Sequence, residues 1–384
     1  MTTTLGARRL PLAARPIAGE SLRSLLEETA RRHEVPVLDV LRAAGVQVAR
    51  ASGAALHRLD NRVADSEGDG LCVALALDRD TLNGLTLHGG AGSVVAGWRQ
   101  GLVRHLGWGV GGTGRHCPRC LAENGGRWLL AWLTPWTIVC VRHQVVLENA
   151  CQACGEPPRS DGYANYWTPH GGRCTAKAPG STSTGRHARS CNADLTDVEA
   201  LQAPTTSYAL LGQTYVDQVL ADEPGGPAAQ DRLKDLHFAA RRLHRHYEPG
   251  DQPLTGLDVQ AMDLWAQYRD GLRRALGGRA FWADTDTAIY RASFATCTGL
   301  AAQALGGTRE DRMAVLTPLM AREPLGGLHL PYDYGDQRHE VKQRRLPYYW
   351  MARRVGRHLY DVAREVTALV VVPCRDVGGD ARLA

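Results

Sequence analysis

The sequence lacks any run of eighteen or more apolar residues, and its N-terminal segment MTTTLGARRLPLAARP has no apolar stretch as long as a secretion signal needs. These absences lead us to expect a soluble, cytoplasmic protein with no membrane partner. In a reducing compartment ten cysteines are not expected to form structural disulfides. Clustered cysteines in this chain are therefore better explained by metal binding.

Lysine is also scarce, since only three of the 45 Lys and Arg residues are lysines. Arginine makes planar, bidentate contacts with phosphate and carboxylate, so this bias fits a nucleic-acid partner. Genomic base composition alone can also replace lysine with arginine, and both explanations stay open. The net charge of +5 is mild.

Several signatures of catalysis are missing. No GxSxG or HExxH motif occurs, and the acidic residues are spread along expected helical surfaces rather than clustered as in a transposase. The stretch Gly109–His116 is a near miss to a nucleotide-binding P-loop. Arg115 stands where the lysine would reach the phosphates, and His116 replaces the magnesium-binding hydroxyl. We therefore expect no enzyme active site.

Two helices are predicted within Gly19–Gly45. Ser21 is a suitable N-cap for the first helix, and apolar residues follow it at three- and four-residue spacing. Pro36 starts the second helix and Gly45 ends it. Two short helices with a tight break fit either a helix-turn-helix or an ordinary helical hairpin, and these residues alone do not decide between them.

The next segments predict a loop at Ala64–Gly70 and then a further helical unit, in which Asp80 or Thr81 caps a short helix. The glycine-rich stretch Gly107–His116 suggests a domain boundary. We therefore assign residues 1–110 to a helical N-terminal domain and residues 111–200 to tandem zinc-binding modules.

Residues 201–384 have no further cysteine cluster, and helical periodicity returns. Apolar residues lie at helical spacing in Asp231–Tyr247 and in Val259–Leu276, and Leu369–Pro373 fits a short strand. The length suits about two or three domains. The expected fold class is mainly α, with small zinc-ribbon β elements between two helical domains.

The cysteines provide the strongest signal. Cys-x₂-Cys, Cys-x₂-His and Cys-x₂-Cys pairs follow one another, and two single cysteines come after them; the eight candidate ligands are Cys117, Cys120, Cys140, His143, Cys151, Cys154, Cys174 and Cys191. A two-residue spacer lets two side chains point at one ion with tetrahedral angles, and CPRC and CQACG carry the Pro and Gly that such turns favour. The pattern predicts two structural Zn²⁺ ions.

Sequential pairing is favoured, with the first four residues around one ion and the last four around the other. A cross-braced arrangement usually needs the second and third pairs almost abutting, whereas seven residues separate His143 from Cys151. In the second site His170 or His187 remains an alternative to Cys174. The alternative hypothesis, a redox-active Cys-x₂-Cys pair, gives no role to Cys140, His143, Cys174 and Cys191.

Four protein ligands leave no open coordination position, so both sites are expected to be structural. A metal-dependent hydrolase or deaminase would need an open position beside a glutamate, and Glu123 is the nearest one. Trp128, Trp132 and Trp136 lie four residues apart, and we expect them to form the small core of a zinc module rather than a base-stacking surface.

The ordered set of motifs resembles the TniQ family, which includes TnsD-type target selectors of transposons. The likeness covers roughly residues 15–200 and is carried by GESLRSLLEETA, RHCPRCLAE, VCVRHQVVLENACQACG and CNADL. Two features depart from the family pattern: Asn192 stands where a glycine is usual, and Cys174 and Cys191 are farther apart than usual. These departures concern the geometry of the second module.

The resemblance implies a non-catalytic adaptor in transposition. Such adaptors engage target DNA or a DNA-bound guide complex, including a CRISPR guide complex, and recruit an AAA+ ATPase that brings the transposase; some act as dimers. A bacterial, nucleoid-associated location follows. The alternative is a protein-interaction scaffold with structural zinc that binds a guide or regulator complex without contacting DNA.

The most basic window, Arg338–His358, is the first candidate for DNA contact, because its cations can neutralise phosphates and its aromatic residues can stack on bases. A solvated helix with a buried aromatic face explains the same pattern equally well. Its candidate DNA-binding residues are Lys342, Arg344, Arg345, Arg353, Arg354 and Arg357. Further candidates are Arg173, Arg186 and Arg189, and the N-terminal helices if they form a helix-turn-helix.

Overall fold

The structure is a computed structural model of the 384-residue chain, and it describes residues 7–47, 53–87, 115–134, 136–159, 170–181, 189–222, 227–251, 256–275 and 288–308, with a few isolated residues. The chain divides into two compact units. The first comprises Met1–Gln202 with Pro224–Gly226, and the second comprises Ala203–Glu223 with Pro227–Ala384. Each is considered by itself below.

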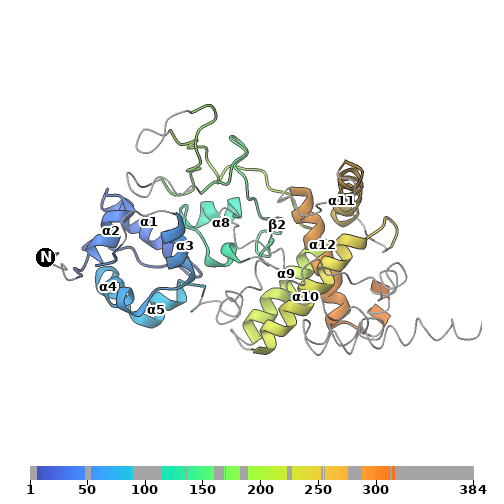
Figure 1. The fold of residues 1–384 in the computed structure, drawn as a ribbon, viewed down its shortest axis with the longest axis horizontal. Helices are drawn as coiled ribbons and strands as arrows, with labels where there is room; N and C mark the ends of the chain where they lie inside the picture. The colour runs from blue at the N-terminus through green and yellow to red at the C-terminus, as the bar shows by residue number, and fades with distance from the viewer. Residues whose placement is uncertain are drawn as a thin grey trace, which may run out of the picture. The chain divides into compact units, whose positions relative to one another are not determined.

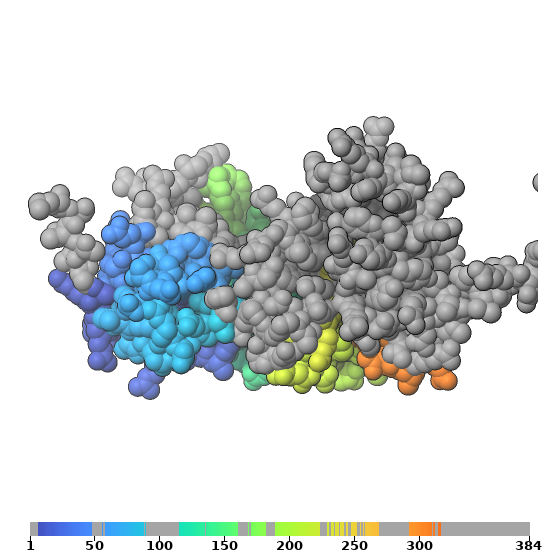
Figure 2. All heavy atoms as spheres, turned by 60° about the horizontal axis from the view of Figure 1, so that its bottom comes forward, coloured from blue at the N-terminus to red at the C-terminus, as the bar shows by residue number. Residues whose placement is uncertain are grey.

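The first unit begins with five helices (Figure 1), namely α1 (Leu22–Arg32), α2 (Val37–Ala43), α3 (Gly53–Asn61), α4 (Asp65–Leu75) and α5 (Arg79–Gly84). Their apolar residues form one core, which includes Leu25, Leu41 and Leu71, all fully buried. Figure 2 shows the atoms of this helical group as contiguous blue to cyan spheres. Burial of these apolar faces, rather than helix propensity, stabilises such short helices.

The two predicted N-terminal helices are confirmed. The Ser21 side chain accepts a hydrogen bond from the Ser24 backbone N–H and caps α1, while Pro36 stands directly before α2. Gly45 adopts φ +73°, a left-handed conformation that glycine reaches without strain, and its N–H donates to the Arg42 carbonyl.

The prediction of a loop at Ala64–Gly70 is wrong, because most of this segment forms the start of α4. Glu67 anchors the first turn: its Oε2 accepts from the Ala64 N–H at 3.4 Å and lies 2.6 Å from Arg58 Nη1. Gly70 serves close packing rather than a turn, since a Cβ there would lie 2.0 Å from the Ala44 carbonyl oxygen. Glycine is thus needed inside this helix despite its cost in propensity.

The prediction of which residue caps the following helix is also wrong. Asp78, rather than Asp80 or Thr81, caps α5: its Oδ1 accepts from the Thr81 N–H at 2.7 Å, and its Oδ2 accepts from the Thr81 hydroxyl at 2.8 Å. Asp78 thereby satisfies one of the backbone donors that every helix start leaves unpaired.

In its described residues, the cysteine-rich part of the first unit contains short elements. These are α8 (Pro118–Glu123), a 3₁₀ turn η2 (Leu130–Leu133) and a two-stranded antiparallel sheet of β1 (Val139–Cys140) and β2 (Val145–Val146), in which Val139 pairs with Val146. Trp128, Trp132 and Trp136 are buried, as predicted for a core role. Trp128 and Trp132 meet edge to face, with ring centroids 5.6 Å apart.

The second unit has α9 (Tyr208–Asp222), α10 (Pro227–His246), α11 (Gly256–Ala275) and α12 (Ala288–Gly306). The helices predicted within Asp231–Tyr247 and Val259–Leu276 are confirmed as α10 and α11. Leu233, Leu236 and Leu243 of α10 are buried, as are Met262 and Trp265 of α11. With the two-stranded sheet as the only named sheet among the described residues, the mainly helical fold class is confirmed.

Helix α12 is not apparent from sequence periodicity, because small residues line nearly its whole described circumference and most of them are buried. It packs very closely on α9 at two glycines. A Cβ on Gly212 would lie 2.6 Å from the Gly299 nitrogen, and one on Gly299 would lie 1.8 Å from the Tyr208 carbonyl oxygen. A helix buried on several sides shows no polar stripe, so the usual 3.6-residue signal is absent.

No helix in the described part of the chain is both long and apolar enough to cross a membrane. The basic window around Arg338–His358, the strand predicted at Leu369–Pro373 and most of the glycine-rich stretch Gly107–His116 lie outside the described residues.

Candidate metal centres

The first Cys/His cluster joins the start of a helix to the turn of a hairpin. Cys117 is the N-cap of α8, with Pro118 in the first helical position, and Cys120 follows one turn later. Cys140 ends β1, and His143 lies in the turn that leads to β2. The CPRC sequence favours this local structure because proline is well suited to the first position of a helix.

The four side chains converge on one point. His143 Nδ1 lies 3.3 Å from Cys117 Sγ, 3.2 Å from Cys120 Sγ and 3.6 Å from Cys140 Sγ, and Cys120 Sγ lies 3.6 Å from Cys140 Sγ. All four candidate donor atoms lie within 4.8 Å of one another. Gln144 has φ +54°, and its N–H donates to the Cys140 carbonyl at 2.7 Å, which closes the turn that carries His143.

The second cluster contains Cys151, Cys154, Cys174 and Cys191. Cys151 and Cys154 share a tight turn that ends at Gly155, whose φ is +75°. Cys174 and Cys191 come from facing extended segments: Cys174 N–H donates to the Ala193 carbonyl and Cys191 N–H to the Ala176 carbonyl. Cys151 Sγ lies 3.8 Å from Cys191 Sγ, and Cys154 Sγ lies 3.8 Å from Cys174 Sγ.

The sulfur–sulfur distances fit tetrahedral zinc. With Zn–S bonds of about 2.3 Å and Zn–N bonds of about 2.0–2.1 Å, tetrahedral angles separate two sulfurs by about 3.8 Å and a sulfur from a nitrogen by about 3.6 Å. The observed S···S distances are 3.6 to 3.8 Å. A disulfide would bring two sulfurs to about 2.05 Å, and none of the nine cysteines in the described residues forms a disulfide.

The structure groups the eight side chains as sequential pairing predicts, with four in each cluster. Cys174 takes the place for which His170 and His187 were alternatives. His170 is exposed and does not join the second cluster, while His187 lies outside the described residues. The sixteen residues between Cys174 and Cys191 are accommodated because the two cysteines lie on facing segments rather than in one knuckle.

The sulfurs lie close enough together to change one another's pKa. Hydrogen bonds from Cys117 and Cys120 lower the pKa of Cys140, whereas the neighbouring Cys117 and Cys140 raise the pKa of Cys120. In the second cluster burial raises the pKa of Cys154 to about 11 and also raises the pKa of Cys174. Neighbouring thiolates repel one another, and a divalent cation bound between them would remove that penalty.

A carboxylate lies outside the first cluster, against its histidine. Glu123 Oε1 is 3.0 Å from His143 Nε2, and Glu123 Oε2 is 3.0 Å from Arg142 Nη2. The sequence identified Glu123 only as the nearest acid for a hydrolytic site. Its position three residues after Cys120, at the end of a helix that Cys117 caps, was the signal for this contact.

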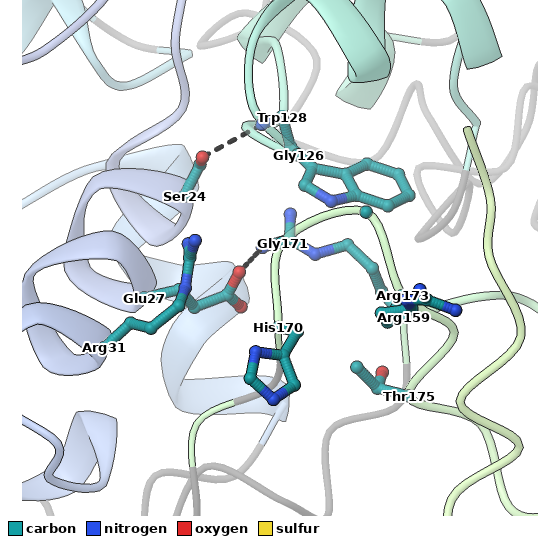
Figure 3. A pocket seen from close by; sticks show the side chains of 11 residues that line it. Ser24, Glu27, Arg31, Gly126, Trp128, Arg159, His170, Gly171, Arg173 and Thr175 are labelled. Carbon is teal, nitrogen blue, oxygen red and sulfur yellow. Dashed lines mark hydrogen bonds and ion pairs between the residues drawn. The ribbon is translucent and has the colours of Figure 1, made fainter.

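Polar contacts link the helical core to the cysteine-rich part of the same unit. We call these contacts the polar seam: Glu20, Ser24 and Glu27 from α1 and the residues before it, with Arg127, Trp128 and Arg159. Glu20 is fully buried and pairs with Arg127, and Ser24 Oγ accepts from the Trp128 N–H at 2.9 Å. Glu27 pairs with Arg159, whose guanidinium lies 4.7 Å from the centroid of the Trp128 ring (Figure 3).

Sequence reasoning missed the polar seam. Arg127 precedes the second half of the first cluster, and Arg159 follows the first knuckle of the second cluster. Their partners lie 107 and 132 residues earlier in the chain. No local spacing could have predicted these contacts. The GESLRSLLEE stretch therefore has two roles, because its leucines enter the helical core while its polar residues bind the cysteine-rich part.

Most of the residues predicted to contact DNA lie outside the part of the chain that the structure describes. Lys342, Arg344, Arg345, Arg353, Arg354 and Arg357 lie outside the described residues, as does Arg186. Arg173 and Arg189 are exposed, and Arg173 Nη2 lies 3.2 Å from Asp194 Oδ2.

The fold and these clusters define a mainly helical protein with two compact Cys/His clusters, each with four side chains that could hold a metal ion. Residues 11–147 match the family model TniQ, which confirms the resemblance over that range. TniQ proteins are a family of non-catalytic adaptors associated with transposition. The match includes the N-terminal helices and the whole first cluster and ends before Cys151, so the second cluster lies beyond it. No curated protein and no solved structure matches the chain.

Proposed function

We propose that this protein is a zinc-stabilised, non-catalytic adaptor that engages target DNA in transposition and recruits an AAA+ ATPase, which in turn brings the transposase. The observation that carries the proposal is the TniQ match over residues 11–147, a range whose described residues include the helical core and the first Cys/His cluster. In this proposal Cys117, Cys120, Cys140 and His143 hold one Zn²⁺. Cys151, Cys154, Cys174 and Cys191 hold the other.

The clusters support a structural rather than catalytic use of metal. Each supplies four protein donors, and a tetrahedral ion with four protein ligands has no position left for water or substrate. Glu123, the acid that a hydrolytic mechanism would need, already contacts His143 and Arg142. These features argue against a zinc hydrolase or deaminase.

Metal analysis of the purified chain is the first test. We expect two zinc ions per chain, and Cys117→Ser should lose one ion and destabilise the first unit, because apparent structural-zinc binding contributes on the order of 10–16 kcal/mol to folding. A zinc content near zero would refute the zinc-stabilised adaptor.

DNA contact is tested by gel shift with no partner present, at several salt concentrations. Each phosphate contact adds about 0.9 to the slope of log K against log salt, so removing four arginines should flatten the slope by up to about 4. The variant replaces Arg344, Arg345, Arg353 and Arg354 with Ala. Arg9→Ala with Arg62→Ala, two exposed arginines of the N-terminal part, is the control.

An unchanged slope in the four-site variant would move the DNA site elsewhere. Wild-type protein that binds a guide or regulator complex but no DNA would favour the protein-interaction scaffold instead. Co-purification with the AAA+ ATPase tests the recruitment step separately.

A further inference from the structure

Glu123 contacts the ring nitrogen of His143 that faces away from the first cluster. Nδ1 of His143 points at the three sulfurs, at 3.2 to 3.6 Å, while Nε2 lies 3.0 Å from Glu123 Oε1. A neutral imidazole has one protonated and one unprotonated nitrogen, so a carboxylate at Nε2 favours the proton there and leaves the Nδ1 lone pair free for a cation.

The short helix α8 explains how the carboxylate reaches this position. Residues three apart on a helix lie on the same face, so Cys120 and Glu123 project from one side of α8. Cys120 reaches the cluster from the first turn, and Glu123 reaches the outer edge of the His143 ring from the last residue. Arg142, which precedes His143, contacts the other oxygen of Glu123.

The second cluster provides an internal comparison. Its four donors are all sulfurs, which have no second nitrogen to be oriented, and the residue three positions after Cys154 is Pro157. The first cluster, which contains a histidine, thus has a glutamate three residues after its second cysteine. The second cluster, which has no histidine, has a proline at the corresponding position.

From this geometry we propose that Glu123 is a positioning residue for the metal site, which fixes the tautomer and ring orientation of His143 and so raises the metal affinity of the first cluster. The inference rests on the proposed zinc sites. It concerns how strongly the first site holds its metal, and it is independent of whether the protein contacts DNA.

The test is competition for zinc between a chelator and the full-length protein. To tell the two sites apart, the measurement is repeated with cadmium in place of zinc, because Cys₃His and Cys₄ sites give separate cadmium NMR resonances. Glu123→Ala should weaken the first site about 10- to 100-fold, as loss of such outer partners does elsewhere, and leave the second site unchanged. Glu123→Gln should weaken it less, because its amide oxygen still accepts a hydrogen bond from Nε2. Glu156→Ala removes an exposed glutamate beside the second knuckle and should change neither site.

A double-mutant cycle separates positioning from general structural support. In a His143→Cys background the fourth donor is a thiolate that needs no N–H partner, so adding Glu123→Ala should no longer weaken the first site. In the metal-free protein, long-range nitrogen NMR of the His143 ring should show the Nε2-protonated form in wild type and lose that preference in Glu123→Ala.

Two results would overturn the proposal. One is wild-type zinc affinity of the first site in Glu123→Ala; the other is a loss that persists undiminished in the His143→Cys background. A wild-type protein that holds no zinc would instead contradict the zinc sites themselves, and DNA binding without any effect of Glu123 would leave the proposed function standing.

Discussion

Asp60 is a buried residue with only 1% of its surface exposed, and the charges of Arg159 and Glu27 of the polar seam act on its carboxyl group. Its Oδ1 accepts from the Arg23 N–H at 2.9 Å, and burial raises its pKa to about 6 from an ordinary value of 3.8. A carboxyl with a raised pKa in the folded state binds its proton more tightly there than in the unfolded chain. Its contribution to stability is therefore fully present below about pH 4 and is lost as the pH rises through about 6.

We predict that Asp60→Asn removes this dependence. The free energy of unfolding of the variant, minus that of wild type, should increase by roughly 1–2 kcal/mol between pH 5 and pH 8, because only wild type loses stability as Asp60 ionises. Urea denaturation at both pH values measures the difference. Asp39→Asn, at a surface aspartate of α2, should leave it near zero. Parallel pH curves for wild type and Asp60→Asn would show that Asp60 is ionised in both states.

The Glu20–Arg127 pair provides a second test at the scale of single residues. Burial raises the pKa of Glu20, although Ser24 and Arg127 both act to lower it. Arg127→Ala would leave a buried carboxylate without its cation, and breaking a buried pair in this way costs about 3–5 kcal/mol. Replacing both partners, as Glu20→Gln with Arg127→Met, should cost less than Arg127→Ala alone. Equal losses would mean that packing by the arginine stem, rather than charge, holds the two parts together.

At the scale of elements, the loops of the two clusters touch through glycine. Gly126 follows α8 and Gly171 precedes Cys174, and a Cβ on Gly126 would lie 2.1 Å from the Gly171 carbonyl carbon. The two clusters also share one apolar core, which includes Trp128, Leu147 and Leu195. The two clusters thus belong to one packed structure and are not two independent modules.

We predict that Gly126→Ala disrupts this contact. Gly125 is a matched control, because both glycines have positive φ, at +62° and +82°, yet a Cβ on Gly125 would meet nothing within 4 Å. Gly125→Ala should therefore cost only the left-handed strain, about 1–2 kcal/mol, while Gly126→Ala adds the clash with backbone that cannot rotate away. Thermal unfolding of the zinc-loaded proteins measures both. Equal costs would show that the loops separate without penalty.

The sequence predicts elements well where one face is apolar and the other is polar. α1, α2, α10 and α11 show this pattern, and the structure confirms them. α12 lacks a polar face, and the start of α4 is rich in Asp and Gly, so both were missed for physical reasons. Gly70 of α4 is needed because the Ala44 carbonyl packs against it. This contact comes from tertiary packing, which no local sequence pattern encodes.

At the scale of the whole molecule, six of the eight candidate ligands were predictable because two-residue spacers dictate local knuckles. The grouping into two clusters follows the order of the ligands along the chain. What surrounds the clusters was not predictable: Arg127 and Arg159 contact residues more than a hundred positions away. Such contacts depend on how the helical core and the cysteine-rich part pack, which only the folded chain determines.

The two units should respond differently to metal removal. Both clusters lie in the first unit, whereas the second unit has its own helical core around Met262, Trp265 and Leu300. Chelation should therefore remove hydrogen-exchange protection from residues 115–202 while α9–α12 stay protected, because exchange reports the stability of each cooperative region separately.

Single-site variants sharpen this prediction. Cys117→Ser and Cys154→Ser act on different clusters, but the shared core and the glycine contact couple them, so each should lower protection across both clusters rather than across its own alone. Loss confined to the mutated cluster would show two independent modules. Loss of protection in α9–α12 as well would show that the helical unit depends on the metal-binding one. The expected result lies between these limits because apolar contacts join the two clusters and the helices of the second unit bury a core of their own.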